Sequence, residues 1–476
     1  MSKYKTILSI CVCLSVGLLL YGLFQEGAFR QFTQTNIGWA NDVGTLRNNL
    51  KNKNYTAIEE TIDPYIMKYE NGEVSGNDIS NLFLAFSVVD PELEANIESW
   101  LENDTWNAKV AASNYYSSMA WAWRGGEFYS RIPDVNREKF KQYLLKAYLV
   151  LPDDMGNKLK DALVTAQKIE YLNEGAPSKI SEMEFIGSAL TNYADSRLVL
   201  ESIERATSEK WGDDKALRQQ VVYELDKMSL PEESVLYYRG EDARNDRNYP
   251  VAIQNLQKAI SINPNEARYH YSLSRAYFGT KQDDKALEEI NKVLKHWPHS
   301  SNAYRIRANA HFRLKKFDEA GKDIDKALSY SPYDRKMNSL AVSIYGKLND
   351  TAKLNQAVDR SLHFAQADRY QLAKVADSLF YNTKQWDKAE DLYKSVVKIE
   401  PLDVAGNYGL SVIYGRLQSC NIVKTIYDYM KGCALGVGKT KRKCASQYIN
   451  WAHSAVNHLK ANQKCAEINE YDFSAF

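Results

Sequence analysis

Hydrophobic residues recur with the spacing of α-helices along most of the chain. From Tyr55 onward the hydrophobic spacing is helical, and no stretch alternates hydrophobic and polar residues for long enough to predict a sheet. Prolines, glycines and polar runs interrupt this pattern in the first half of the chain, at Pro64, Asn71–Asn77, Pro91, Pro133, Pro152 and Gly175–Pro177. The pattern therefore predicts an all-α fold.

A 34-residue period organises the second half of the chain. Pro264, Pro298 and Pro332 follow one another at this spacing. In the same register, small or apolar residues recur in four columns: Gly240, Ser274 and Ala308; Ala252, Ala286 and Ala320; Leu256, Ile290 and Ile324; Ala259, Val293 and Ala327. Small residues let two helices approach closely, and proline cannot continue a helix. The period predicts a solenoid of helix pairs that bury their apolar faces on one another.

These columns resemble those of the tetratricopeptide repeat, a 34-residue unit of two antiparallel helices. The resemblance implies five to six units over residues 231–431, beginning near Glu233, Ala267, Ser301, Arg335, Tyr370 and Val404. The fourth unit is degenerate, because Gln366 stands in place of the proline and one extra residue precedes the next unit. The predicted order is an N-terminal segment (1–29), a helical domain (30–230), the solenoid and a C-terminal helical cap (432–476).

In this family the first helix of each unit lines a concave surface that binds peptides. The matching residues here are Tyr237, Glu241, Arg244, Arg268, Tyr271, Arg275, Phe278, Asn302, Arg305, Asn309, Phe312 and Arg313. Arginines combined with aromatic side chains suit an acidic peptide or a peptide C-terminus, through charge-assisted hydrogen bonds and stacking. A solvated helix face with some aromatic packing is the competing interpretation. The carboxylate clamp of chaperone-binding relatives is incomplete here, so we do not predict one.

An uncharged apolar run occupies the N-terminus, from Ile7 to Phe24. As a helix it would span roughly 27 Å, close to the thickness of the hydrocarbon core of a bilayer. Lys3 and Lys5 precede it, so the positive-inside rule predicts a single-pass protein of the inner membrane with its bulk on the periplasmic side. A cleaved signal peptide is the alternative, although the run is longer than usual and lacks a small-residue cleavage site.

Tryptophans cluster in the helical domain, and the last two, Trp121 and Trp123, precede Arg124, Gly125 and Gly126. The glycines are expected to end a helix there. Residues 97–172 resemble a bacterial domain of unknown function that often accompanies tetratricopeptide repeats; this resemblance implies a fold and no activity. Core packing around the arginine is one interpretation of the cluster. A sugar- or peptide-binding site is the other.

Four of the six cysteines lie near the C-terminus: Cys420, Cys433, Cys444 and Cys465. On an oxidising side of the membrane, an even, clustered set of cysteines predicts two disulfides. Of the three pairings, an antiparallel pair of helices at 421–431 and 441–461 favours Cys420 with Cys465 and Cys433 with Cys444. These nested bonds would clamp the open end of the solenoid, where a cap is needed.

Composition and motifs narrow the function further. The chain has 61 Lys and Arg against 60 Asp and Glu, a net charge of +1 that gives no sign of nucleic-acid binding. Common hydrolase, zinc-protease and dinucleotide motifs are absent, and His453 and His458 do not share a helix face, so we expect no enzyme, no cofactor and no metal. The expected function is a membrane-anchored scaffold that binds protein or peptide partners in a cell-envelope assembly. The alternative is a ligand-binding or catalytic module in residues 97–172, supported by the repeats.

Overall fold

Helices and turns make up the part of the chain that the structure describes. The computed structural model describes residues 39–125, 132–153, 156–176, 181–207, 217, 221, 231–364, 368–437, 444–462 and 465–473. These ranges contain no β-strand, which confirms the predicted all-α fold. No helix within them is long and apolar enough to span a bilayer. The predicted anchor, Ile7–Phe24, lies outside the described residues.

The helical domain before the repeats has two hydrophobic cores. The larger includes the fully buried side chains of Trp100 and Tyr115, and the smaller lies around Ile169 and Ile203. At the starts of two of its helices, the side chains of Ser75 and Thr105 accept hydrogen bonds from backbone N–H groups, as N-cap residues do. The elements are α2 (Trp39–Lys51), α3 (Tyr55–Glu70), α4 (Gly76–Phe83), η1 (Leu84–Phe86), η2 (Pro91–Leu93), α5 (Glu94–Leu101), α6 (Trp106–Arg124), α7 (Asp134–Leu149), α8 (Lys158–Asn173), α9 (Glu182–Tyr193) and α10 (Arg197–Ala206).

Six helix pairs follow the helical domain. The first helices of the pairs are α12 (Glu232–Asn245), α14 (Ala267–Gly279), α16 (Ser301–Arg313), α18 (Arg335–Leu348), α20 (Arg369–Ser378) and α22 (Val404–Arg416). The second helices are α13 (Tyr249–Ile262), α15 (Asp283–His296), α17 (Phe317–Tyr330), α19 (Thr351–Leu362), α21 (Trp386–Ile399) and α23 (Ile422–Leu435). Successive first helices contact one another more extensively than successive second helices do, so the first helices form the inner, concave side of the array.

The 34-residue period is visible in the backbone as well as in the sequence. Positive φ angles recur at the turn inside each unit, at Arg247, Lys281, Lys315, Asn349, Lys384 and Gln418. The N-cap residues of the first helices of units two to six recur in the same way, at Glu266, Ser300, Asp334, Asp368 and Asp403. Each of these side chains accepts a backbone N–H from the first turn of its helix. The backbone therefore repeats six times.

The extra residue lies inside the fifth unit, which corrects the expectation that it precedes that unit. The N-cap and the positive-φ residue are 15 positions apart in the second, third, fourth and sixth units and 16 apart in the fifth, from Asp368 to Lys384. A π-helical turn, η4 (Leu379–Thr383), follows α20 and accommodates the added residue. Gln366, which replaces the proline, lies outside the described residues.

The helical domain docks on the loops around the degenerate fourth unit. Trp123 packs edge-on against Phe364, with the ring centroids 5.0 Å apart, and Phe364 joins the core of the helical domain. The side-chain amide of Asn136 donates 2.8 Å hydrogen bonds to the carbonyls of both Trp123 and Phe364. Nearby, the Tyr333 N–H donates to the Val89 carbonyl at 3.0 Å. The unit that departs from the repeat pattern is therefore the one that carries the helical domain.

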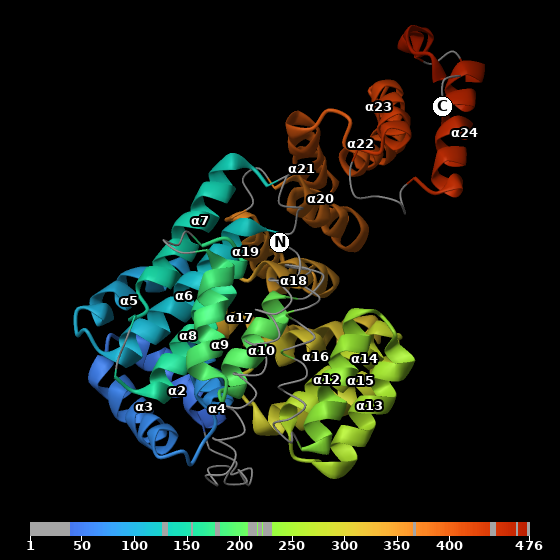
Figure 1. The fold of residues 1–476 in the computed structure, drawn as a ribbon. Helices are drawn as coiled ribbons and strands as arrows, with labels where there is room; N and C mark the ends of the chain where they lie inside the picture. Colours follow the sequence, from blue (N-terminus) through green and yellow to red (C-terminus); the bar gives the residue numbers. More distant parts are fainter. Residues whose placement is uncertain are drawn as a thin grey trace, which may run out of the picture.

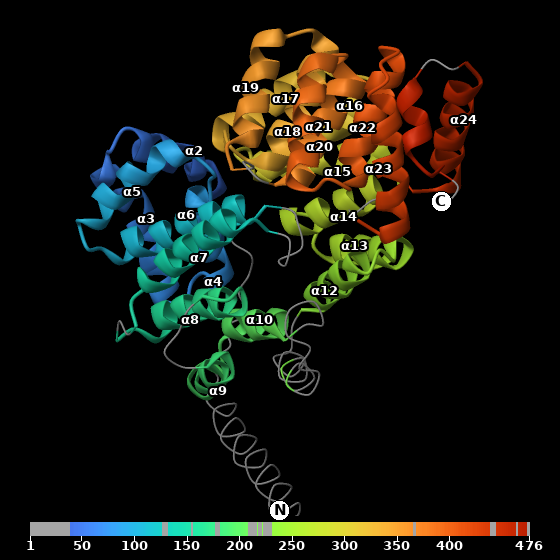
Figure 2. The same cartoon turned by 90° about the horizontal axis from the view of Figure 1, so that it is seen from above.

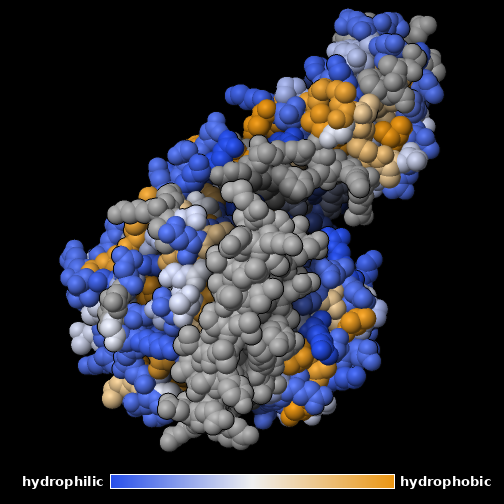
Figure 3. All heavy atoms as spheres, in the orientation of Figure 1, coloured by the Kyte–Doolittle hydropathy of each residue, from blue (hydrophilic) through white to orange (hydrophobic). Residues whose placement is uncertain are grey.

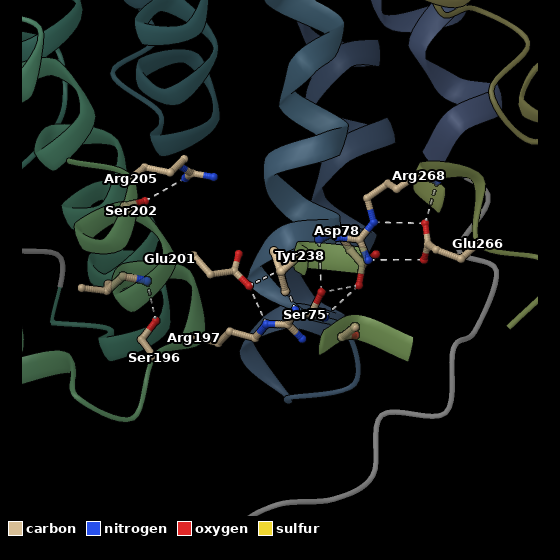
Figure 4. Close-up of polar contacts among 12 residues, drawn as sticks. Ser75, Asp78, Ser196, Arg197, Glu201, Ser202, Arg205, Tyr238, Glu266 and Arg268 are labelled. Atoms are coloured by element: carbon tan, nitrogen blue, oxygen red, sulfur yellow. Dashed lines mark hydrogen bonds and ion pairs between the residues drawn. The ribbon is translucent and has the colours of Figure 1, made fainter. Parts of the chain in front are cut away.

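A second, polar contact joins the helical domain to the first repeat. Arg197 and Glu201 of α10 and Tyr238 of α12 lie together in Figure 4. The Arg197 guanidinium donates to the Glu201 carboxylate and to the Tyr238 hydroxyl, both at 2.6 Å, and this hydroxyl donates to Glu201. Together with Arg47 of α2, which lies over the Tyr330 ring and donates to the His299 carbonyl at 3.4 Å, these contacts hold the helical domain beside the repeats, as Figures 1 and 2 show.

Two disulfides brace the C-terminal helix α24 (Ser446–Asn462), which η5 (Ala466–Glu470) follows. Cys420 is bonded to Cys465 and Cys433 to Cys444, with Cα atoms 5.4 and 5.6 Å apart. This is the nested arrangement that the helix-pair argument favours. Because α23 extends to Leu435, the last helix of the sixth unit runs past the expected boundary at residue 431. Figure 3 shows hydrophobic residues gathered over α22 and α23.

Candidate peptide-binding surface

Three of the predicted peptide-binding residues belong to the first unit or its boundary and are already engaged within the protein. The Arg244 guanidinium forms a bidentate pair with Glu241, at 2.7 and 2.8 Å. The Arg268 guanidinium donates to both carboxylate oxygens of Glu266, at 3.0 and 3.3 Å. Tyr237 packs on Tyr269, with ring centroids 5.1 Å apart. These contacts favour a structural role for the side chains at this end of the concave surface.

The two predicted phenylalanines also take part in packing. The Arg313 guanidinium lies 4.4 Å from the ring centroid of Phe278, and it donates to the backbone carbonyl of the same residue at 3.1 Å. Phe312 packs against Phe317, with ring centroids 5.6 Å apart. Phe278 therefore contacts the first helix of the next unit and Phe312 contacts the second helix of its own unit, so both rings are engaged in packing.

Tyr271, Arg275, Arg305 and Asn309 lie on α14 and α16, and all but Arg275 are half-buried. Arg275 is exposed and lies over the ring of Tyr271, 5.7 Å from its centroid. Arg305 occupies on α16 the position that Tyr271 occupies on α14, and half-buried Asn309 occupies that of Arg275. The Nε atom of Arg305 is buried and has no hydrogen-bond partner among the described residues. A buried donor without an acceptor is costly, so this site is suited to an anionic ligand.

Three cations of the next two units, which the sequence analysis missed, extend this patch. Lys336 holds on α18 the position of Arg268 on α14, and Arg335 precedes it. Lys374 lies on α20. We call Arg275, Arg305, Arg335, Lys336 and Lys374 the cationic surface. Repeating the 34-residue step into the degenerate unit would have identified Lys336. The expected start of the fifth unit at Tyr370 would have placed Lys374 in the column of Tyr271 and Arg305, but we followed the columns only as far as the third unit.

Electrostatics shows that the five cations act on one another. Partial desolvation, together with the charges of Arg305 and Arg335, lowers the pKa of Lys336 below the ordinary lysine value. The pKa of Lys374 is lowered by desolvation and by Arg335, Lys336 and Arg305. Arg335 is paired with Asp368 at 3.3 Å. Within the described part of the chain, no carboxylate lies at ion-pair distance from the other four, so their mutual repulsion is only partly compensated.

The tryptophan cluster of the helical domain takes part in packing and docking. The Trp121 indole N–H donates to Glu174 at 3.0 Å, and its ring meets Phe140 edge-on. Arg124 lies over the ring of Trp121, and Trp123 packs on the repeats as described above. Burial raises the pKa of Glu174 to about 7, with the Trp121 hydrogen bond opposing this effect. These contacts fit the interpretation of the cluster as core packing.

Comparison with known families agrees with the period, the caps and the turns. Residues 244–310 match the family model of the tetratricopeptide repeat. The chain carries tetratricopeptide repeats. The matched segment begins at the end of α12 and finishes within α16, so it spans the boundary between the first, second and third repeats. No curated protein matches the chain.

Solved structures of other tetratricopeptide-repeat proteins resemble the chain in fold. PilW, a type IV pilus biogenesis factor, is 16% identical, covers 47% of this chain and 98% of its own, and has a TM-score of 0.38. A tetratricopeptide repeat protein from Parabacteroides merdae is 13% identical, and the match covers 61% of this chain and 99% of that protein, with a TM-score of 0.38. TTC0263 from Thermus thermophilus is 16% identical, and the match covers 38% of this chain and 98% of that protein, with a TM-score of 0.32. Similarity at this level concerns the helix-pair fold and not function.

Proposed function

We propose that the protein is a scaffold whose cationic surface binds an acidic segment of a partner protein. The observation that carries the proposal is the gathering of Arg275, Arg305, Lys336 and Lys374 on successive first helices, with no described carboxylate at ion-pair distance from any of them. An extended peptide laid across these helices would meet one cation after another. Each carboxylate would form charge-assisted hydrogen bonds with the guanidinium or ammonium group that it meets.

Partner carboxylates would also relieve the repulsion within the surface. Lys336 and Lys374 have lowered pKa values, caused first by desolvation and then by neighbouring cations. An anion bound between them would favour their charged forms, so binding and protonation are coupled. A small neutral ligand would leave that repulsion in place. The charge pattern therefore favours an acidic protein segment over a neutral partner.

Features near both ends of the chain support a proposed location for this scaffold. The uncharged run Ile7–Phe24 supports a single-pass anchor in the inner membrane, with the repeats on the periplasmic side. Two disulfides near the C-terminus are in keeping with an oxidising compartment. In this proposal the protein organises partners of a cell-envelope assembly. Thiol labelling of the membrane-extracted protein tests the compartment, because free thiols at Cys420 and Cys465 would contradict it.

Charge reversal tests the binding surface. The probe is a fluorescein-labelled hexaglutamate peptide, and the readout is fluorescence anisotropy at several salt concentrations. The double variant Arg275→Glu, Arg305→Glu should weaken binding on the order of a hundredfold, because two charge-assisted contacts become repulsive. The control variant Lys322→Glu, Lys398→Glu reverses two exposed lysines on the second helices α17 and α21. Equal losses in both variants would show that net charge, and not the concave surface, binds the peptide.

A further inference from the structure

The concave surface changes character at its C-terminal end. Four aromatic rings lie there, from η4, α22 and α24: Tyr381, Tyr408, Tyr448 and Trp451, which we call the aromatic end. Tyr408 occupies on α22 the position that Tyr271 and Arg305 occupy on α14 and α16. Its ring centroid lies 5.4 Å from that of Tyr448 and 5.7 Å from that of Trp451. The rings therefore continue the surface on which the cations lie.

The aromatic end is accessible and is close to a negative charge. Tyr381 is 54% exposed, and Tyr448 and Trp451 are half-buried. Asp377 of α20 lies one turn before Tyr381 and occupies the position of Arg275 and Asn309 in its repeat. Burial raises the pKa of Tyr381, and the electrostatic effects of Tyr408 and Asp377 raise it further. The Asp377 carboxylate also accepts a hydrogen bond from the Tyr393 hydroxyl at 2.6 Å, so Asp377 is held in place.

Several tyrosine rings elsewhere in the repeats have a cation of the protein over them. The pairs include Arg268 over Tyr237, Arg275 over Tyr271, Arg307 over Tyr304 and Lys353 over Tyr345, with the cation 5.3 to 6.0 Å from the ring centroid. Among the cation–ring contacts of the described residues, none involves Tyr381, Tyr448 or Trp451. Arg416, on the neighbouring helix, lies instead over Phe380 and Trp386.

We propose that the aromatic end binds a cationic side chain, lysine or arginine, that adjoins the acidic segment of the same partner. This inference rests on the proposed function and adds the partner's charge pattern: acidic residues along the cationic surface, followed by a basic residue over the rings. The negative face of an aromatic ring attracts a cation, and Asp377 adds a full charge of the right sign. Repulsion from the cationic surface would otherwise exclude such a residue, so the aromatic end also sets the direction in which the segment lies.

Three labelled peptides test the inference by fluorescence anisotropy. The reference is hexaglutamate with norleucine at both ends; in each of the other two, one norleucine is replaced by lysine. Because lysine lowers the net negative charge of the peptide, simple attraction to the cationic surface predicts weaker binding of both. The aromatic end predicts that one of the two lysine peptides binds about tenfold more tightly than the reference.

Variants locate that preference. Tyr381→Ala should abolish the lysine preference while the reference peptide binds as before, and Tyr381→Phe, which keeps the ring, should retain it. Arg275→Glu with Arg305→Glu should weaken all three peptides. Circular dichroism verifies that each variant is folded. If the wild type binds the reference and neither lysine peptide binds more tightly, the aromatic-end inference is wrong and the scaffold proposal stands. If none of the three peptides binds, both are wrong.

Discussion

The cationic surface and the aromatic end lie on the same row of first helices, yet they are built and held in opposite ways. The cationic surface consists of like charges on four successive first helices, where desolvation and then neighbouring cations lower the pKa values of Lys336 and Lys374. The aromatic end consists of rings that pack on one another around Tyr408. Non-covalent docking of the helical domain supports the first, through Phe364 and Asn136, whereas disulfides support the second.

This difference shows where a repeat array needs support. Like charges that face one another destabilise the fold, so units three to five gain from contact with a second domain. Aromatic packing stabilises the last units by itself, but a terminal repeat has a neighbour on one side only. A cross-link holds such an end without using the concave surface. Breaking either support should therefore affect one end of the surface and spare the other.

The largest effect is expected from the disulfide between Cys420 and Cys465. Replacing both by serine removes a bond that closes a loop of 45 residues, which should destabilise the C-terminal end by about 4 kcal/mol. Hydrogen exchange of α24 should accelerate and the lysine preference at the aromatic end should disappear. Binding of the norleucine reference peptide should persist. An equal loss of reference-peptide binding would show that the two ends are not independent.

Removing the non-covalent support should have a somewhat smaller effect. Phe364 is buried and its ring meets Trp123, so Phe364→Ala should cost about 3 kcal/mol. Hydrogen exchange should accelerate in α6 and α7, and the reference peptide should bind a few-fold more weakly. Phe312→Ala is the matched control, because Phe312 packs on Phe317 within the third repeat. Unchanged exchange in α6 and α7 after Phe364→Ala would rule out this docking contact.

The pH dependence of the helical domain provides a third test. Burial raises the pKa of Glu174 from 4.5 to about 7, with the Trp121 hydrogen bond opposing the shift. The folded state therefore keeps a proton that the unfolded chain loses above its lower pKa. Stability is full below about pH 4.5 and falls as the pH rises through 7, by up to about 3 kcal/mol in total.

Glu174→Gln keeps an acceptor for the Trp121 indole and cannot ionise. It should raise the free energy of unfolding at pH 8 and leave it unchanged at pH 4, as measured by urea unfolding. Glu102→Gln, at an exposed position, controls for the loss of a charge. A gain that is the same at both pH values would show that Glu174 is not buried as a neutral acid. The disulfides, and not the helical domain, hold α24. The same pH change should therefore leave hydrogen exchange in α24 unaltered.

The sequence predicts the repeat region well because each unit repeats a local requirement. The spacing of Pro264, Pro298 and Pro332 is enough to place the helix pairs, and the same register places Arg275 and Arg305 on the concave surface. The extra residue could not be located from sequence, because a π-helical turn changes the register without a distinctive residue.

The hydrophobic spacing and the repeat period do not predict which distant parts of the chain contact each other. Trp123 and Phe364 meet across more than two hundred residues, and neither position shows which partner it has. Gly125 is instructive: it was expected only to end a helix. Its φ is +72°, and a Cβ there would lie 2.5 Å from the Asp368 carboxylate, so the glycine also permits docking. Such a close approach is visible only in three dimensions.

The smallest predicted effect changes one charge within the cationic surface. Asp368 accepts a hydrogen bond from Arg335 at 3.3 Å and caps α20 through the Gln371 N–H at 3.0 Å. Asp368→Asn retains an oxygen for the cap and removes the counter-charge of Arg335. The norleucine reference peptide should then bind about fivefold more tightly, with the lysine preference unchanged.

Asp403→Asn is the matched control for this variant. Asp403 caps α22 in the same way, and its ion-pair partner is Arg369, which is not part of the cationic surface. If both variants tighten binding equally, overall charge explains the effect. If only Asp368→Asn does so, Arg335 contributes directly to peptide binding, and the cationic surface reaches the loop on which the helical domain docks. In that case, the degenerate fourth unit both carries the helical domain and supplies a binding residue.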